Sequence, residues 1–126
     1  MTHSFSLLPE VFAICRLHGD HAIPPWAVTG MFFSITRSPD EVSIVCPQSN
    51  VPERIRCHRG WRCLKLEGVF DPMMVGVISS IAAPLAEGGV SIFVISTFDT
   101  DYLLVKHENL EKATQILTAH GHTVTH

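Results

Sequence analysis

The polar groups that could do chemistry in this chain are concentrated in six residues, 96–101, which read S-T-F-D-T-D. Ser96, Thr97 and Thr100 carry hydroxyl groups, and Asp99 and Asp101 carry carboxylates. Such groups hydrogen-bond small polar molecules, and a carboxylate pairs well with an ammonium or guanidinium group. The flanking runs, S-I-F-V-I before and Y-L-L-V after, are apolar and predict the two strands of a buried hairpin. A polar tip on rigid strands is a common place for recognition residues, so this hairpin is the first candidate for a binding site.

The composition of the chain favours a globular protein and argues against a nucleic-acid partner. Of 126 residues, 46% are hydrophobic and 17% are charged, a balance that excludes general disorder. The formal net charge of −3 gives no support for nucleic-acid binding, which normally requires a basic stripe. The only basic cluster lies in residues 54–62, has acidic neighbours on both sides, and is expected to be a solvated face.

The N-terminal sequence and the cysteines predict a reduced, cytoplasmic protein that does not enter a membrane. The first ten residues lack a basic start, and Pro9 and Glu10 interrupt their apolar run, so they do not form a secretion signal. No stretch approaches the ~18 apolar residues that a membrane span needs. Without a signal, the four cysteines are expected to be free thiols, with Cys15 and Cys46 packed as small core residues in apolar strands.

The second half of the chain predicts a β-α-β-β-α-β order. The expected elements are a strand (residues 61–70), a helix (72–87), two strands (90–97 and 101–106), a helix (110–120) and a short strand (122–125). Asp71-Pro72 supplies a start for the first helix, and Gly88-Gly89 supplies its end. This order is typical of the ferredoxin-like fold, in which both helices lie on one face of an antiparallel sheet.

The first half of the chain repeats this pattern in a shorter form. Residues 31–37 and 42–46 are strand-like and are joined by the turn sequence S-P-D-E. A shift of sixty positions superimposes the two hairpins and places Glu41 on Asp101. The helical segments of this half allow only a turn or two each. We therefore predict an α+β protein of two tandem ferredoxin-like βαββαβ modules, a degenerate N-terminal module in residues 1–58 and a C-terminal module in residues 59–126.

Two runs of the sequence resemble a known family. They are L-A-E-G-G-V-S-I-F-V-I-S-T-F-D-T-D-Y-L-L-V at residues 85–105 and F-F-S-I-T-R-S-P-D-E-V-S-I-V-C at residues 32–46. Together they resemble the small tandem ACT-domain proteins, bacterial relatives of the CASTOR-type amino-acid sensors, from Leu8 to Val124. The motif is an E-x-G-(I/V) loop followed within ten residues by S-T-x-x-T-D-Y. The resemblance implies modules that bind a small molecule, most often an amino acid, and signal its presence to an enzyme or partner.

The resemblance also implies where a ligand binds. In the sensor relatives an amino acid lies between modules, against the loop after the first helix and the hairpin loop. Carried onto this chain, the ligand-binding residues are Glu87, Gly88, Gly89 and Val90 from the first loop and Thr97, Phe98 and Asp101 from the hairpin. The resulting hypothesis is a cytoplasmic, homodimeric amino-acid sensor that acts through ligand-dependent assembly or partner contact. It is not an enzyme, and no cofactor, metal-binding residue or catalytic residue is expected.

Two alternatives stay open at this stage. The chain could be an ACT-like oligomerisation or interaction module that binds no ligand, in which case the glycine pair only ends a helix and the hairpin tip is only a turn. It could also be a small enzyme built around Cys57 and His58, although adjacent residues do not by themselves place a base against a thiol. Zinc binding is not expected, because the C-x₅-C spacing around His58 is not that of paired zinc ligands.

Overall fold

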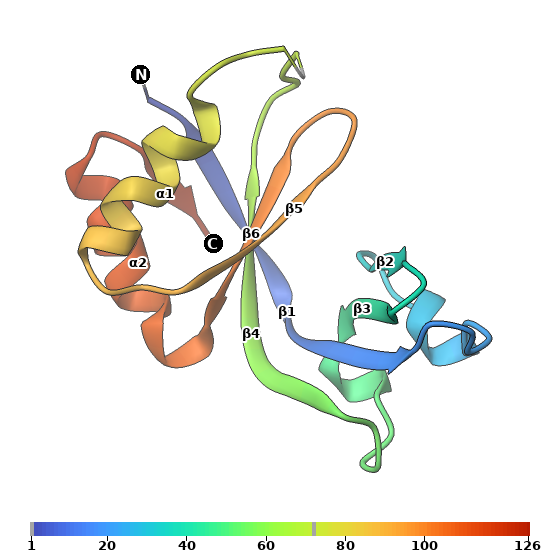
Figure 1. The fold of residues 1–126 in the computed structure, drawn as a ribbon. Helices are drawn as coiled ribbons and strands as arrows, with labels where there is room; N and C mark the ends of the chain where they lie inside the picture. The colour runs from blue at the N-terminus through green and yellow to red at the C-terminus, as the bar shows by residue number, and fades with distance from the viewer. Residues whose placement is uncertain (1, 72) are drawn as a thin grey trace. The chain divides into compact units, whose positions relative to one another are not determined.

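Figure 1 shows the fold in a computed structural model that describes residues 2–71 and 73–126. The strands are β1 (Ser4–His18), β2 (Ser34–Arg37), β3 (Glu41–Pro47), β4 (Cys57–Leu66), β5 (Ile92–Ser96), β6 (Asp101–Lys106) and β7 (Thr123–Thr125). The helices are α1 (Val77–Glu87) and α2 (Leu110–Ala119), with the short 3₁₀ helices η1 (Pro25–Val28), η2 (Gln48–Asn50) and η3 (His107–Asn109). The described chain divides into two compact units. The N-terminal unit is Glu10–Trp61, and the C-terminal unit joins the chain up to Pro9 to Arg62–His126.

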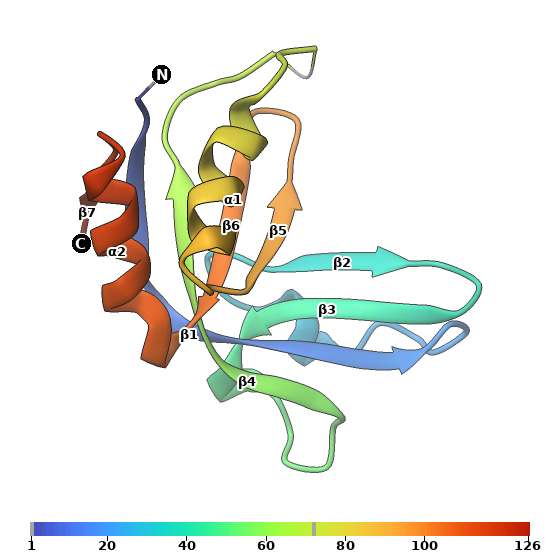
Figure 2. The ribbon, with the colours of Figure 1, turned by 60° about the vertical axis from the view of Figure 1, so that its left-hand side comes forward.

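The C-terminal unit has the predicted β-α-β-β-α-β order, from β4 through α1, β5, β6 and α2 to β7. Its hydrogen-bonded strands follow the order β7-β1-β4-β6-β5. Strands β5 and β6 are antiparallel, with Ile92 opposite Val105 and Ser96 opposite Asp101. Both helices lie on the same face of this sheet (Figure 2). The predicted α+β, ferredoxin-like fold class is therefore confirmed.

The first residues of β1 form a strand that the sequence analysis did not predict. Ser4, Phe5 and Ser6 pair in parallel with β7, and the carbonyl of Ser4 accepts a hydrogen bond of 2.8 Å from the N–H of Glu67. Phe5 is completely buried in the core of the C-terminal unit. This unit therefore includes residues from far upstream in the sequence. The predicted boundary between residues 58 and 59 separates two repeated modules of the sequence, which need not coincide with the compact units. It stays a prediction.

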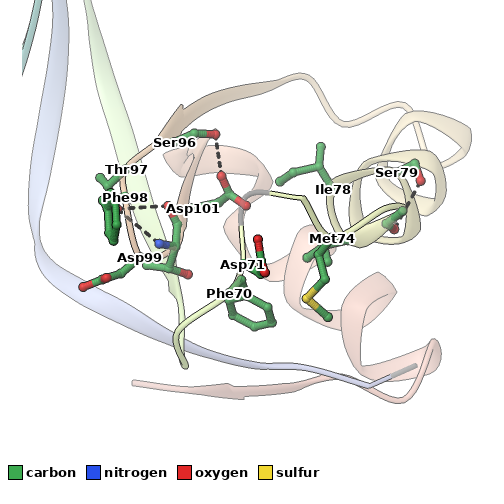
Figure 3. A pocket seen from close by; sticks show the side chains of 13 residues that line it. Phe70, Asp71, Met74, Ile78, Ser79, Ser96, Thr97, Phe98, Asp99 and Asp101 are labelled. Carbon is green, nitrogen blue, oxygen red and sulfur yellow. Dashed lines mark hydrogen bonds between the residues drawn. The ribbon is translucent and has the colours of Figure 1, made fainter.

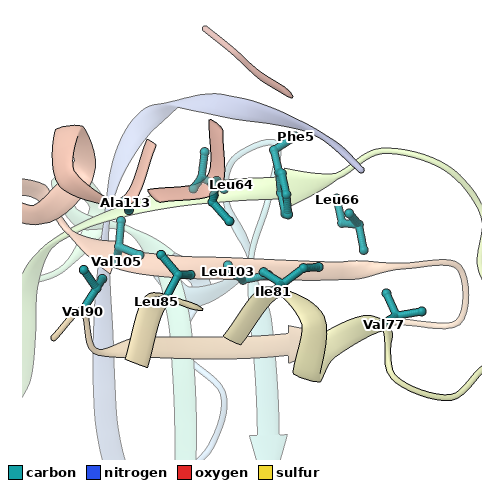
Figure 4. Packing of buried hydrophobic residues seen from close by; sticks show 11 residues of the cluster. Phe5, Leu64, Leu66, Val77, Ile81, Leu85, Val90, Leu103, Val105 and Ala113 are labelled. Carbon is teal, nitrogen blue, oxygen red and sulfur yellow. The ribbon is translucent and has the colours of Figure 1, made fainter. Parts of the chain in front are cut away.

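The core of the C-terminal unit lies between the two helices and the sheet (Figure 4). Helix α1 contributes Val77, Ile81 and Leu85, which are buried at the four-residue spacing that places side chains on one helix face. Strand β6 contributes a continuous buried run, Leu103 to Val105. Fully burying one such side chain stabilises a fold by about 1.5–3 kcal/mol. This packing fixes the positions of α1 and the β5–β6 hairpin.

Helix α1 begins several residues later than predicted, at Val77 rather than at residue 72. The preceding segment forms turns, because the N–H of Met73 donates to the Asp71 carboxylate at 2.8 Å and the N–H of Met74 donates to the Asp71 carbonyl at 2.9 Å. Gly76 then takes a left-handed conformation, with φ of +86°, which no helix interior can include. Pro72, at which the helix was predicted to start, lies outside the described residues.

Helix α1 ends at the predicted glycine pair. The N–H of Gly88 donates to Pro84 at 3.1 Å and that of Gly89 to Ala86 at 3.0 Å, so both glycines satisfy carbonyls of the last turn. Gly89 has a φ of +78°, a conformation that costs other L-residues free energy. A Cβ atom on Gly88 would lie 2.4 Å from the Cδ1 atom of Ile116 on α2. Each glycine therefore has a structural role of its own.

The N-terminal unit is a small sheet whose hydrogen-bonded strands follow the order β2-β3-β1-β4. Strands β2 and β3 form the predicted antiparallel hairpin, and the N–H of Ser38 donates to the Glu41 carbonyl at 2.9 Å to close its turn. Where the C-terminal unit has helices, this unit has only the 3₁₀ helices η1 and η2 among its described residues. Its separate core is made by residues Ala13, Cys15, Leu17, Ala27, Val42, Ile44, Cys46 and Val51.

Neither α1 nor α2, the α-helices of the described residues, is long and apolar enough to cross a membrane.

A buried pair of histidines joins the start of β1 to the segment before β7. The backbone N–H of His3 donates to Nδ1 of the His122 ring at 3.0 Å. The two imidazole rings stack with their centroids 5.5 Å apart. The edges of Phe5 and Phe70 complete the environment, since Phe5 packs against His122 and Phe70 against His3. Burial, which disfavours the charged form, lowers the pKa of both imidazoles below the ordinary value of 6.5.

The histidine pair should make the protein less stable in mild acid. Because the pKa of each imidazole is lower in the folded state, the unfolded chain binds protons first as the pH falls below about 6.5. The contribution of this pair to the free energy of unfolding should therefore be constant above that pH and fall as the pH drops from 6.5 to the lowered pKa values. The melting temperature of the wild type and of His122→Gln, measured from pH 8 to pH 5, checks this. The variant should lose part of the pH dependence, and an unchanged slope would contradict the prediction.

The conformation of Gly89 makes a second prediction. Gly89→Ala should lower the free energy of unfolding by about 1 kcal/mol, because alanine is strained at positive φ. Gly89→Asn should lose less, because asparagine tolerates the left-handed conformation better. Urea denaturation followed by circular dichroism measures both variants. Equal losses for alanine and asparagine would show that the backbone conformation is not what position 89 requires.

Candidate functional site

A cavity of about 390 Å³ opens at one end of the C-terminal unit, between the loop before α1 and the tip of the β5–β6 hairpin (Figure 3). We call it the hairpin cavity. Its lining residues are Phe70, Asp71, Met74, Gly76, Val77, Ile78, Ser79, Ser96, Thr97, Phe98, Asp99, Thr100 and Asp101. Its volume lies within the range typical of small-molecule sites. The predicted polar tip therefore forms one wall of a real cavity.

Hydrogen bonds hold the hairpin tip in one conformation. The N–H of Thr97 donates to the carbonyl of Thr100 at 2.8 Å, and the N–H of Thr100 donates back to the Thr97 hydroxyl at 3.2 Å. Thr100 is buried, and its own hydroxyl donates to the carbonyl of Leu66 at 2.6 Å. The Thr100 hydroxyl therefore anchors the tip to the end of β4.

The second wall is tied to the first by a backbone hydrogen bond. The N–H of Phe70 donates to the carbonyl of Asp99 at 2.7 Å, which joins the loop before α1 to the hairpin tip. Two cavity carboxylates are oriented by local donors. Asp101 accepts a hydrogen bond from the Ser96 hydroxyl, and Asp71 accepts one from the N–H of Met73. Asp71 and Asp101 both project between the hairpin tip and the start of α1 (Figure 3).

The charge in the cavity is strongly uneven. Asp71, Asp99 and Asp101 supply three carboxylates, and none of the thirteen described lining residues is basic. Carboxylates gathered without a basic partner favour a bound cation. On the wall that also carries Asp71, Gly76, Val77 and Ser79 line the cavity with the start of α1, and no side chain in the described part of the chain caps that helix end. Its N–H groups carry partial positive charge and attract an anionic group.

The structure separates the predicted ligand-binding residues into two groups. Thr97, Phe98 and Asp101 line the hairpin cavity. Gly89 and Val90 line a second depression of about 490 Å³ on the outside of α1 and β5. Its other lining residues are Ala82, Ala86, Ser91 and Ile92, so it has no charged side chain among the described residues. Glu87 is the last residue of α1 and Gly88 is its C-cap, and neither residue lines either cavity.

The distance between these groups follows from the lengths of the elements that join them. Helix α1 has 11 residues and β5 has 5, and at their usual rise each spans about 16 Å. The hairpin tip follows the far end of β5, and residues 87–90 precede its near end. A single amino acid is too short to contact both groups within one protomer.

The loop before α1, which forms the second wall of the hairpin cavity, was not predicted from the sequence. Asp71 and Gly76 were interpreted as flanking or belonging to a helix, whereas both line the cavity. The signal that could have revealed the loop is Gly76, because a glycine within an otherwise apolar, helix-like run often marks an end. Met73 and Val75 are 84% and 91% exposed, which confirms that the apolar residues before Gly76 do not form a buried helical stripe.

The residues considered for metal binding or nucleophilic catalysis do not form such a site. Across residues 2–71 and 73–126, no group of three or more His, Cys, Asp and Glu side chains is arranged to hold a metal ion. Cys57 packs against the core of the N-terminal unit, whereas the next strand residue, His58, is exposed. Successive side chains on a strand point to opposite faces, which is why this thiol and this imidazole do not converge.

Comparison with known proteins identifies relatives of this chain. A family model described as an ACT domain matches residues 56–119, and a second model, described as an N-terminal domain, matches residues 10–54. The human protein CASTOR3P is 28% identical over 101 residues, which are 70% of this chain and 62% of the relative. The chain therefore spans less than two thirds of the length of that relative.

Two solved structures share the fold. A crystal structure of a protein from Agobacterium tumefaciens is 41% identical, with a TM-score of 0.93, and the match covers 98% of this chain and 92% of that chain. The regulatory subunit of aspartate kinase from Thermus flavus has a TM-score of 0.63 at 11% identity, and the match covers 93% of this chain and 96% of that chain.

The ACT-domain match extends over just over half of the chain. It includes both walls of the hairpin cavity and most of the elements that position them. Together with the β-α-β-β-α-β order of the C-terminal unit, this match shows that the chain belongs to the ACT-domain family.

Proposed function

We propose that this protein binds a free amino acid in the hairpin cavity and that the bound state regulates assembly or contact with a partner. The observation that carries the proposal is the presence of opposite charges in one cavity of an ACT-domain chain. Asp99 and Asp101 line the hairpin wall, and Asp71 and the uncapped first turn of α1 line the other. An amino acid carries an ammonium and a carboxylate group and so matches both kinds of charge. The protein would act as a regulator and not as an enzyme.

The geometry supports a specific orientation of the ligand. The α-carboxylate would lie against the N–H groups at the start of α1, where the helix dipole favours an anion. The α-ammonium group would lie between Asp71 and Asp101, whose carboxylates project into the cavity. Asp99 is the third carboxylate and would suit a second positive group. A basic amino acid is therefore favoured over a neutral or an acidic one.

The family and the neighbours support the regulatory part of the proposal. The Thermus flavus neighbour is by its description a regulatory subunit, and it matches this chain over nearly its whole length. At 11% identity that likeness shows only a shared fold, so the cavity chemistry must decide the ligand. The free thiols of all four cysteines support a reducing, cytoplasmic location.

Exposed apolar residues offer a way for the bound ligand to affect assembly. Around the hairpin cavity, the side chains of Val69, Met73, Val75 and Phe98 are each at least 80% exposed. Phe98 belongs to the hairpin wall and the others to the loop before α1, so a ligand that holds the walls together also holds this apolar rim. A homodimer would cover the rim, and its second copy could bring Glu87, Gly88, Gly89 and Val90 to the ligand.

A module that binds no ligand and serves only for assembly is the second candidate. The same apolar rim favours it, because exposed apolar surface of this kind commonly marks an interaction site. The two candidates differ in one measurable property. Only the sensor predicts that an amino acid stabilises the chain.

The central prediction concerns binding of amino acids to the full chain. Each of the twenty should be tested by thermal shift and calorimetry, and arginine or lysine should give the largest response. A ligand at 100 times its dissociation constant stabilises the folded state by about 2.7 kcal/mol. Asp101→Asn should weaken binding by about tenfold or more, because a charge-assisted hydrogen bond contributes about 1.5–3 kcal/mol. Asp20→Asn, an exposed carboxylate of the N-terminal unit, is the matched control.

The outcomes separate the possible sites and functions. Unchanged affinity in Asp101→Asn would exclude the hairpin cavity as the site. A loss in Glu87→Gln, with a dimer measured by light scattering, would show that a second copy completes the site. No response from any amino acid, with folding confirmed by circular dichroism, would favour the assembly module.

A further inference from the structure

Three of the four cysteines come together in the N-terminal unit, although they are far apart in the sequence. Cys15, Cys46 and Cys57 lie on β1, β3 and β4, which are neighbours in the sheet. All three belong to one hydrophobic cluster, and all are free thiols. Cys63, the fourth cysteine, is buried in the C-terminal unit and does not belong to this cluster. The proposed amino-acid site makes no use of these thiols.

The three cysteines form a row across neighbouring strands, with Cys15 in the middle, because β1 lies between β3 and β4. Their side chains pack in the same hydrophobic cluster. The neighbouring Cys46 and burial raise the pKa of the Cys15 thiol.

The strand register places Cys15 opposite Cys57. The N–H of Arg16 donates to the carbonyl of Arg56 at 3.1 Å, and in an antiparallel pair the residues next to these, Cys15 and Cys57, then face each other without a hydrogen bond between them. Such pairs have Cα atoms about 4.5 Å apart, within the roughly 4.4–6.8 Å that a disulfide bridges. Cys46 lies diagonally, because it is paired with Ala13 rather than with Cys15.

Solvent access differs along the row. Cys46 is completely buried and Cys15 is 2% exposed, whereas Cys57 is partly exposed at the start of β4. An oxidant in solution therefore reaches the Cys57 sulfur first. The Cys15 thiol is the neighbour that can resolve the oxidised sulfur.

We propose that Cys57 and Cys15 are a peroxide-oxidised pair that forms a disulfide between β1 and β4. The Cys57 sulfur attacks a peroxide oxygen, so that an S–O bond forms, the O–O bond breaks, and water or an alcohol leaves. The Cys15 sulfur then attacks the Cys57 sulfur, so that the S–S bond forms and the S–O bond breaks. The hydroxide that leaves takes the Cys15 proton as water. Two thiols are oxidised by two electrons, and one peroxide is reduced.

The surroundings of Cys57 set the rate of this reaction. Burial and the neighbouring Cys15 raise the pKa of Cys57, and the Arg59 guanidinium partly opposes them. Because the thiolate is the reactive form, oxidation should be slow at pH 7 and accelerate about tenfold per pH unit below that pKa. The site therefore responds to sustained exposure to peroxide rather than to brief exposure. The disulfide would close a loop of about 40 residues, which raises resistance to unfolding.

Peptide mapping tests the proposal directly, because trypsin places each cysteine in a different peptide. Cys15 lies in residues 1–16, Cys46 in 38–54, Cys57 in 57–59 and Cys63 in 63–65. The folded full chain is treated with hydrogen peroxide at pH 8, blocked with iodoacetamide and analysed by mass spectrometry. We expect an intact mass lower by two hydrogens, a cross-link between peptides 1–16 and 57–59, and recovery of free thiols with dithiothreitol. The melting temperature should rise by about 5 °C or more on oxidation.

Variants identify the partners. Cys57→Ser should abolish the cross-link, and Cys63→Ser, the matched control, should leave it unchanged. If Cys57→Ser does not fold, the wild-type cross-link and the faster reaction at higher pH still decide the matter. A cross-link of Cys15 to Cys46, oxygen addition to single thiols without a cross-link, or a cross-link formed only in urea would each overturn the proposal.

Discussion

The hydrogen bond from the buried Thr100 hydroxyl to the Leu66 carbonyl, 2.6 Å long, is the constraint on which the candidate site depends. Leu66 is the last residue of β4, so the loop before α1 starts where the hairpin tip is anchored. The backbone hydrogen bond between Phe70 and Asp99 adds a second link between the same two segments. Both walls of the cavity are thus fixed relative to one another before any ligand binds, which lowers the cost of ordering them around a small molecule.

Local patterns in the sequence were enough to predict the β5–β6 hairpin. They were not enough to predict the start of α1 or the pairing of β1 with β7. Strand β6 was predicted to the residue, because an apolar run between turn residues leaves little choice of boundaries. The predicted start of α1 was wrong because the apolar residues keep a helical spacing from Met74 onward. Only the positive φ of Gly76 shows where the helix can begin. The parallel pairing of Ser4 to Ser6 with β7 has no local signature at all.

The candidate site was predictable to the extent that it is one continuous segment. The hairpin tip was found because its hydroxyls and carboxylates are adjacent in the sequence, and the family resemblance supplied a reason to examine it. The facing wall comes from the loop before α1, which resembled a helix start. Residues 87–90 were predicted to bind the same ligand as the hairpin tip because both belong to one sequence motif. In the structure, α1 and β5, each about 16 Å long, separate them. Motif spacing measures distance along the chain and not across the fold.

The uneven charge of the cavity is the property through which a bound amino acid would affect the rest of the protein under the proposed function. Asp71, Asp99 and Asp101 repel one another when no cation lies between them, and they come from both walls. In the proposed complex, a ligand with positive groups would relieve that repulsion without moving the walls, because hydrogen bonds already join them. A ligand that binds this arrangement better than any other that the chain can adopt shifts the population toward it. Val69 and Phe98, which are exposed on the two walls, would then be held in one arrangement for a partner.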